Sequence, residues 1–96
     1  MKVTTRFYGS LRRQVGQRDL ELDLACDTTL AQLLEMMDKR LGVEVGQQLR
    51  PFQDGQFAML ILVNGQDHHF MGGMEAPLPE GALVEFMLPL AGGGLS

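Results

Sequence analysis

One helical pattern in the middle of the chain restricts the fold more than any other feature. The polar residues 27–29 are candidate N-caps, and Gly42 is a typical helix stop. With 96 residues the chain can build one compact core, so this helix must cover one face of whatever the other segments form. The apolar side chains that recur at helical spacing are Leu30, Leu33, Leu34, Met37 and Leu41.

Five further segments predict strands. In residues 20–24 three leucines alternate with acidic residues, which is the period of two that places all three leucines on one face. Met59 to Val63 is a continuous apolar run, typical of a strand covered on both faces, and a turn is favoured directly after it. The other expected strands are Lys2 to Tyr8, Asp67 to Phe70 as a short edge strand, and Leu83 to Leu88.

The resulting order is strand, strand, helix, strand, short strand, strand. Residues 43–57 are expected to be mostly irregular, with a short helical turn around residues 44–49. This order describes an α+β fold of the β-grasp (ubiquitin-like) type, with a mixed sheet of four to five strands covered by one main helix. The domain is expected to span residues 1–90, followed by a flexible glycine-rich tail over residues 91–96.

Composition excludes several classes of partner. The net charge of −4 is spread without acidic or basic blocks, so no nucleic-acid partner is expected. Cys26 is the only cysteine, which excludes an internal disulfide and a multi-cysteine metal site and favours a reducing cytoplasm. No apolar run reaches the roughly 18 residues needed to cross a bilayer, so we expect a cytoplasmic protein with no membrane partner.

The two histidines, His68 and His69, are adjacent in the sequence. In an edge strand their side chains point to opposite faces, so the two imidazoles are not expected to ligate one metal ion together. No metal site is predicted from the sequence.

The last six residues, Ala91 to Ser96, contain little that can pack, and their extended reach is about 20 Å. A chain without Cβ atoms can pass through a channel too narrow for side chains. It can also bring a terminal carboxylate close to the catalytic groups of another protein. The tail is therefore the candidate functional segment.

Residues 83–93, with the sequence LVEFMLPLAGG, resemble the strand, proline and diglycine ending of molybdopterin synthase small subunits. Val3 to Arg13 is similar to the opening strand of that family, and Leu62 to Gly65 and Pro79 to Gly81 match its later turns. The resemblance to this MoaD/ThiS-like family of sulfur carriers covers the whole chain.

The resemblance implies a carrier protein and not an enzyme. In the family, the diglycine carboxylate, here Gly92-Gly93, is adenylated by an E1-like adenylyltransferase of the MoeB and ThiF kind. It is then converted to a thiocarboxylate that donates sulfur, and a MoaE-like synthase subunit is the expected acceptor in molybdopterin or tungstopterin biosynthesis. No cofactor is expected to be bound, because ATP is consumed by the activating partner.

The resemblance also implies which residues face these partners. Phe86 and Arg12 occupy positions that face the activating enzyme or the synthase, and Pro89, Leu90 and Ala91 lead into the tail. The residues alone leave a second interpretation open, in which Phe86 is a core side chain and Arg12 is a solvated one.

Three residues, Gly94, Leu95 and Ser96, extend beyond the expected Gly93 terminus. We expect a processing protease to remove them, with Gly94 as the alternative terminus, although a diverged chain that receives no sulfur remains open. Two other functions also remain open: a protein modifier joined through the same glycine, and a non-covalent β-grasp interaction module.

Overall fold

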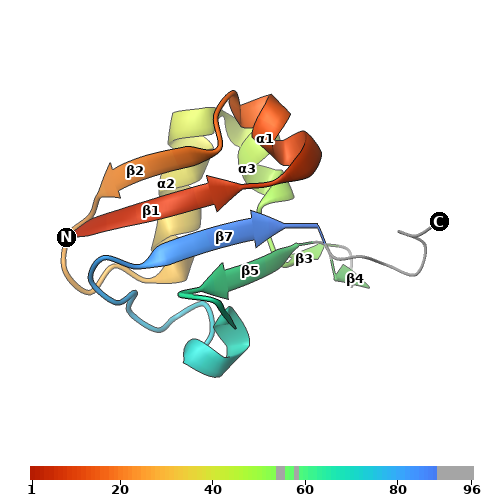
Figure 1. Cartoon of the computed structure of the whole chain (residues 1–96). Coiled ribbons are helices and arrows are strands. Elements are labelled where there is room, and N and C mark those ends of the chain that lie inside the picture. The colour runs from red at the N-terminus through yellow and green to blue at the C-terminus, as the bar shows by residue number, and fades with distance from the viewer. Residues whose placement is uncertain (54–55, 58, 89–96) are drawn as a thin grey trace.

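The computed structural model describes residues 1–53, 56–57 and 59–88, and its main feature is a mixed sheet of five strands. The strands lie in the order β2-β1-β7-β5-β6 (Figure 1). β1 pairs with β7 in parallel, and the other neighbouring strands are antiparallel. This sheet confirms the β-grasp fold expected from the sequence. Its strands are β1 (Lys2–Phe7), β2 (Asp19–Asp23), β5 (Leu60–Val63), β6 (Gln66–Asp67) and β7 (Leu83–Met87).

The helix α2 (Leu30–Leu41) covers one face of the sheet, as its apolar pattern predicts (Figure 1). A capping box fixes its first turn: Gln32 N donates to Thr29 Oγ1 at 3.1 Å, and Thr29 N donates to Gln32 Oε1 at 3.0 Å. Gly42 ends the helix at a φ of 95°. The buried side chains of α2 are Leu30, Leu33, Leu34 and Met37.

A helix that the sequence does not predict, α1 (Gly9–Val15), connects β1 to β2. Its one fully buried side chain is Leu11, and Val15 packs against the core one turn later. Gly16 ends α1 in the left-handed region, where its N–H donates to the Arg12 carbonyl oxygen at 2.9 Å. The helix forms because burying Leu11 stabilises a segment whose local pattern is otherwise polar.

The segment between α2 and β5 contains more regular structure than expected. α3 (Val43–Gln48) confirms the predicted helical turn. β3 (Phe52–Gln53) pairs with β4 (Gln56–Phe57) as a separate two-stranded ribbon, in a region expected to be irregular.

The predicted edge strand over residues 67–70 is wrong beyond its first residue. β6 ends at Asp67, and the 3₁₀ helix η1 (His68–Met71) follows it. The Asp67 carboxylate accepts a hydrogen bond from the backbone N–H of His69 at 2.9 Å and so caps the new helix. This local bond competes with continuation of the strand.

The core lies between α2 and the inner face of the sheet. Side chains alternate along each strand between the inner and the outer face of the sheet, so Phe86 of β7 points inward and Glu85 points outward. The rings of Phe7 and Phe86 stack on neighbouring strands with centroids 5.6 Å apart. Buried apolar side chains of the sheet and α2 include Val3, Phe7, Leu20, Leu22, Leu33, Leu34, Met37, Ile61, Val63, Val84 and Phe86.

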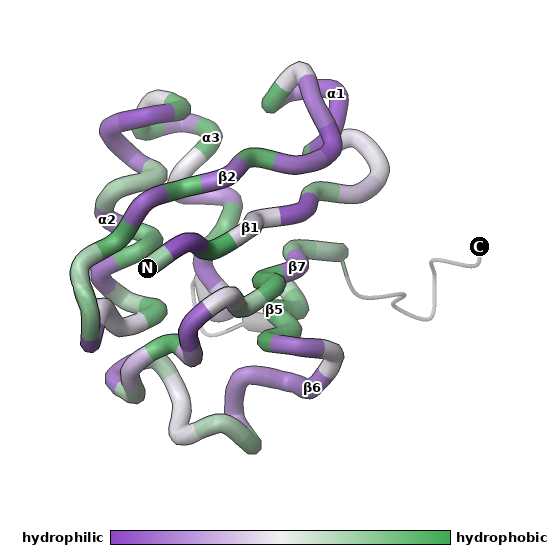
Figure 2. The backbone as a smooth tube through the Cα atoms, turned by 60° about the vertical axis from the view of Figure 1, so that its left-hand side comes forward, coloured by the Kyte–Doolittle hydropathy of each residue, from purple (hydrophilic) through white to green (hydrophobic). Residues whose placement is uncertain are grey.

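The outer face of the sheet, which we call the open face, lies on the side away from α2 and α3 (Figure 1). Hydropathy differs from strand to strand: the residues of β5 and β7 are mostly hydrophobic, whereas hydrophobic and hydrophilic residues alternate in β1 and β2 (Figure 2). Within the described ranges, every helix is too short or too polar to cross a lipid bilayer.

Candidate functional site

The strand β7 leads directly into the predicted reactive tail. β7 lies between β1 and β5 in the middle of the sheet and ends at Met87, and the exposed Leu88 is the last residue described. The remaining predicted site residues lie outside the described residues: Pro89, Leu90, Ala91, Gly92, Gly93, Gly94, Leu95 and Ser96. The structure therefore describes the base of the tail and the surface around that base.

Phe86 does not lie on that surface. Its side chain is 0% exposed and is stacked on Phe7 inside the core. The position implied by the family resemblance is thus occupied by a core side chain, and partner contact through the Phe86 ring would require the sheet to open. The outward neighbours on β7 are Leu83, Glu85 and Met87.

The half of the open face formed by β5 and β7 is apolar. Leu60 lies opposite Met87, and Leu62 lies opposite Glu85 across the antiparallel pair. Both leucines and Met87 are half-buried, so each keeps part of its apolar surface in contact with solvent. We call Leu60, Leu62, Leu83 and Met87 the apolar patch. It adjoins the point where the chain leaves β7 toward the tail.

The other half of the open face, on β1 and β2, is charged. Arg6 donates to Asp19 twice, from Nε to Oδ1 at 2.8 Å and from a terminal nitrogen to Oδ2 at 3.1 Å. The hydrogen bonds of this bidentate pair lower the pKa of the Asp19 carboxyl and raise the pKa of the Arg6 guanidinium. The nearby positive charge of Arg18 lowers the pKa of Asp19 further.

One tyrosine joins the two halves. The Tyr8 hydroxyl donates a hydrogen bond to the Glu85 carboxylate, across the boundary between the charged strand pair and β7. This bond to a carboxylate raises the pKa of Tyr8, and partial burial acts in the same direction. Glu85, the one polar outward residue of β7, is therefore held by a partner within the chain.

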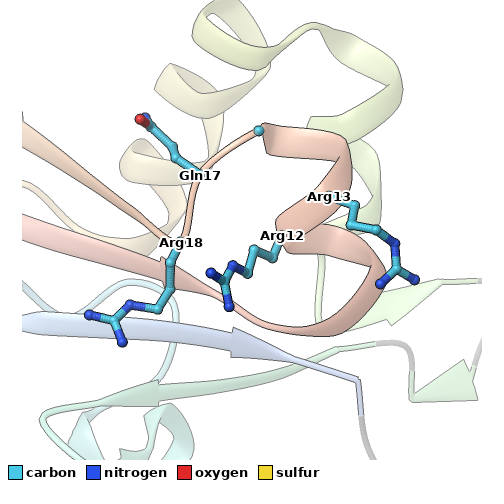
Figure 3. Close-up of a pocket in the computed structure, with 5 residues that line it drawn as sticks. Arg12, Arg13, Gln17 and Arg18 are labelled. Atoms are coloured by element: carbon cyan, nitrogen blue, oxygen red, sulfur yellow. The ribbon is translucent and has the colours of Figure 1, made fainter.

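Arg12 is exposed on α1 whereas Phe86 is buried in the core, so the two predicted residues do not form one surface. Arg12 lines an open hollow of ≈ 330 Å³ together with Arg13, Arg18, Gly16 and Gln17 (Figure 3). In this view Arg12 and Arg18 extend in the same direction, while Arg13 extends to the other side of α1.

Arg18 links the lining of the hollow to the charged pair on the open face, because its Nε lies 3.3 Å from Asp19 Oδ1 at the start of β2. Arg13 and Arg18 were missed as candidate residues. A signal was present in the sequence: four of the eight basic residues (Arg6, Arg12, Arg13 and Arg18) fall within residues 6–18 of a chain with net charge −4.

His68 and His69 lie together, contrary to the expectation of opposed side chains. In η1 their ring centroids are 4.1 Å apart, because a 3₁₀ turn replaces the alternating geometry of a strand. The Asp67 carboxylate joins them, with Oδ1 at 2.7 Å from Nδ1 of His69. Cys26 is exposed.

Comparison with known proteins agrees with the fold. The model of the ThiS family matches residues 5–93. The chain is 27% identical over 95 residues to small archaeal modifier protein 3 of Haloferax volcanii, covering 97% of this chain and 100% of that protein.

Two solved structures extend the comparison. Urm1 from Trypanosoma brucei has a TM-score of 0.70 and 30% identity, over 93% of this chain and 92% of its own. A putative molybdopterin converting factor, subunit 1, from Pyrococcus furiosus has a TM-score of 0.75 at 21% identity, over 93% of this chain and 98% of its own, and shows the fold alone. These matches confirm the resemblance at the level of the family. The chain belongs to the ThiS family of ubiquitin-like sulfur carriers and modifiers.

Proposed function

We propose that this chain is a sulfur carrier whose reacting group is the carboxylate of Gly93, formed after removal of Gly94 to Ser96. The observation that carries the proposal is the family match over residues 5–93, which ends on the second residue of the Gly92-Gly93 pair. Glycine pairs at a chain end can enter a narrow active site because they carry no Cβ.

The proposed chemistry begins with an unreactive group. A terminal carboxyl has a pKa of about 3.5, so at neutral pH it is an anion that resists attack by a sulfur nucleophile. An E1-like adenylyltransferase of the MoeB and ThiF kind joins the carboxylate to AMP from ATP and releases pyrophosphate. Hydrosulfide then attacks the acyl carbon, displaces AMP and leaves a thiocarboxylate. The carrier is a co-substrate in both steps, and the partner supplies the catalytic groups.

The open face is the proposed recognition surface for this partner. Protein interfaces combine an apolar centre with a polar rim, and the apolar patch beside the base of the tail fits such a centre. Arg12 and Arg18 at the adjoining hollow fit the rim, where cations attract acidic groups of a partner and steer its approach. Docking there brings the segment that follows Leu88 toward the activating enzyme.

The proposed sulfur acceptor is a MoaE-like synthase subunit in molybdopterin or tungstopterin biosynthesis. The support is the likeness of residues 83–93 to the ending of molybdopterin synthase small subunits. A second candidate function is conjugation of Gly93 to lysines of other proteins. The full-length relative in Haloferax volcanii, whose name describes a modifier, favours this alternative.

Intact mass spectrometry of the protein from its native host tests the proposal. We expect a chain that ends at Gly93, and a fraction heavier by the replacement of one carboxylate oxygen with sulfur. Lysine adducts that carry the Gly92-Gly93 end would instead support the modifier.

A matched assay uses a chain ended at Gly93 and the Gly93→Ala variant, each with the host adenylyltransferase and ATP. Pyrophosphate release is expected from the first and a large loss from the second. A native protein that keeps Ser96, together with an engineered Gly93 end that is not adenylated, would overturn the proposal and leave a non-covalent module.

A further inference from the structure

The turn after β6 gathers three successive side chains with metal-binding atoms. Asp67 ends β6 and caps η1, and the first two residues of η1 are His68 and His69. One ligand atom from each side chain can be chosen so that all three lie within 4.8 Å of one another. Three consecutive residues of a strand could not do this, because alternation would send the middle side chain to the other face.

The distances within the cluster are close to those of a coordination sphere. Asp67 Oδ1 lies 2.7 Å from His69 Nδ1 and 3.5 Å from His68 Nδ1. Tetrahedral zinc, with bonds of about 2.0 to 2.2 Å to nitrogen and oxygen, holds its ligand atoms about 3.3 to 3.5 Å apart. A cation can enter after small rotations of the side chains, replacing the hydrogen bond between Asp67 and His69.

The three side chains form a gradient of exposure from the core to solvent. His68 is 3% exposed, Asp67 28% and His69 53%. Nδ1 of the buried His68 ring also lies 3.3 Å from the Ile61 carbonyl oxygen. Binding a cation through Nδ1 therefore exchanges that hydrogen bond for the metal bond and leaves the ring proton on Nε2. The exposed side leaves room for water to complete the coordination.

We propose that Asp67, His68 and His69 form a binding site for one divalent transition-metal cation. Two imidazoles and one carboxylate are a donor set that suits zinc, nickel and copper better than calcium or magnesium. An occupied site would tie the end of β6 to η1 and fix the turn that presents Phe70, whose side chain is 83% exposed.

The site can be tested with zinc alone, because the competing ligands in this chain are few. The sequence contains two histidines, both in the cluster, and one cysteine, Cys26, which is exposed. Titration calorimetry with the full-length Cys26→Ser protein is expected to give one zinc per chain. Imidazole ¹H–¹⁵N spectra contain signals from His68 and His69 only, and both sets are expected to shift with zinc.

Two variants test the ligands while retaining the turn. Asp67→Asn keeps a good helix cap but removes the charge, and His69→Asn changes an exposed ring. Each is expected to weaken zinc binding by at least about tenfold. The exposed acidic residue Glu80 provides the control, and Glu80→Gln should bind zinc as before. Thermal unfolding verifies that each variant is folded. Absence of zinc binding to the Cys26→Ser protein, or undiminished binding by folded His69→Asn, would overturn the proposal.

Discussion

The neighbouring residues Phe86 and Met87 separate the role of the core from that of the open face. Phe86 is fully buried and stacked on Phe7, with ring centroids 5.6 Å apart. Truncation of a buried phenylalanine to alanine costs about 3 to 5 kcal/mol, because the transfer free energy is lost and a cavity remains. The stacked pair places Phe86→Ala in the upper part of that range. Small domains are stable by about 5 to 15 kcal/mol, so this change removes a large share of the total.

Urea denaturation measures this cost. With a loss of about 4 kcal/mol and an m-value of about 2 kcal/mol/M, the unfolding midpoint of Phe86→Ala should fall by about 2 M while m stays constant. The matched control is Met87→Ala, since Met87 is half-buried on the open face of the same strand. Its cost should be about 1 kcal/mol or less.

The loss of affinity for the proposed adenylyltransferase partner should rank the two variants in the opposite order. Met87→Ala removes part of the apolar patch and should weaken binding, whereas Phe86→Ala should affect binding only to the extent that it unfolds the protein. A midpoint shift below about 0.5 M for Phe86→Ala, together with weakened binding by the folded variant, would refute this assignment of the two faces.

Three further predictions follow from local contacts. Tyr8 is the only tyrosine in a chain without tryptophan, so its ultraviolet titration should have a midpoint above the ordinary 10.0, and Glu85→Gln should lower that midpoint. Gly46→Ala places a Cβ 2.9 Å from the Asp38 Cα. Although alanine has the better helix propensity, urea denaturation should show that the free energy of unfolding falls by about 1 to 3 kcal/mol, and a rise would contradict the close packing. Burial lowers the pKa of His68 in the folded protein below the ordinary 6.5 that the residue has in the unfolded chain, so near and below pH 6.5 the unfolded chain binds more protons than the folded one. The free energy of unfolding should therefore fall as pH drops below 6.5, and His68→Gln should flatten this dependence.

The main elements of the fold could be predicted because their patterns are long and regular. The leucines of α2 repeat over three turns, and those of residues 20–24 alternate with charges, so one periodicity fits each segment. α1 could not be predicted in the same way. Seven residues supply little more than one apolar pair, Leu11 and Val15, and the packing of that pair on the core decides the structure.

The turn at His68 was misassigned for a different reason. β6 has only two residues, which is too short for an alternating pattern, and a single hydrogen bond to Asp67 then redirects the chain.

The face to which Phe86 belongs was available from the sequence. Glu85 is the one charged residue of β7, and a charged side chain should face solvent. Because side chains alternate along a strand, its neighbour Phe86 should then face the core. The proposed reactive group is a backbone carboxylate and not a side chain, so the sequence points to Gly92 and Gly93 only through the family resemblance.

The central position of β7 has a mechanical consequence. A partner that draws the C-terminal end into its active site exerts tension along this strand. β7 is bonded to β1 on one side and to β5 on the other, so the load is shared by two ladders that resist it in shear. The sheet should therefore remain folded and move as a rigid body when a partner pulls on the C-terminal end.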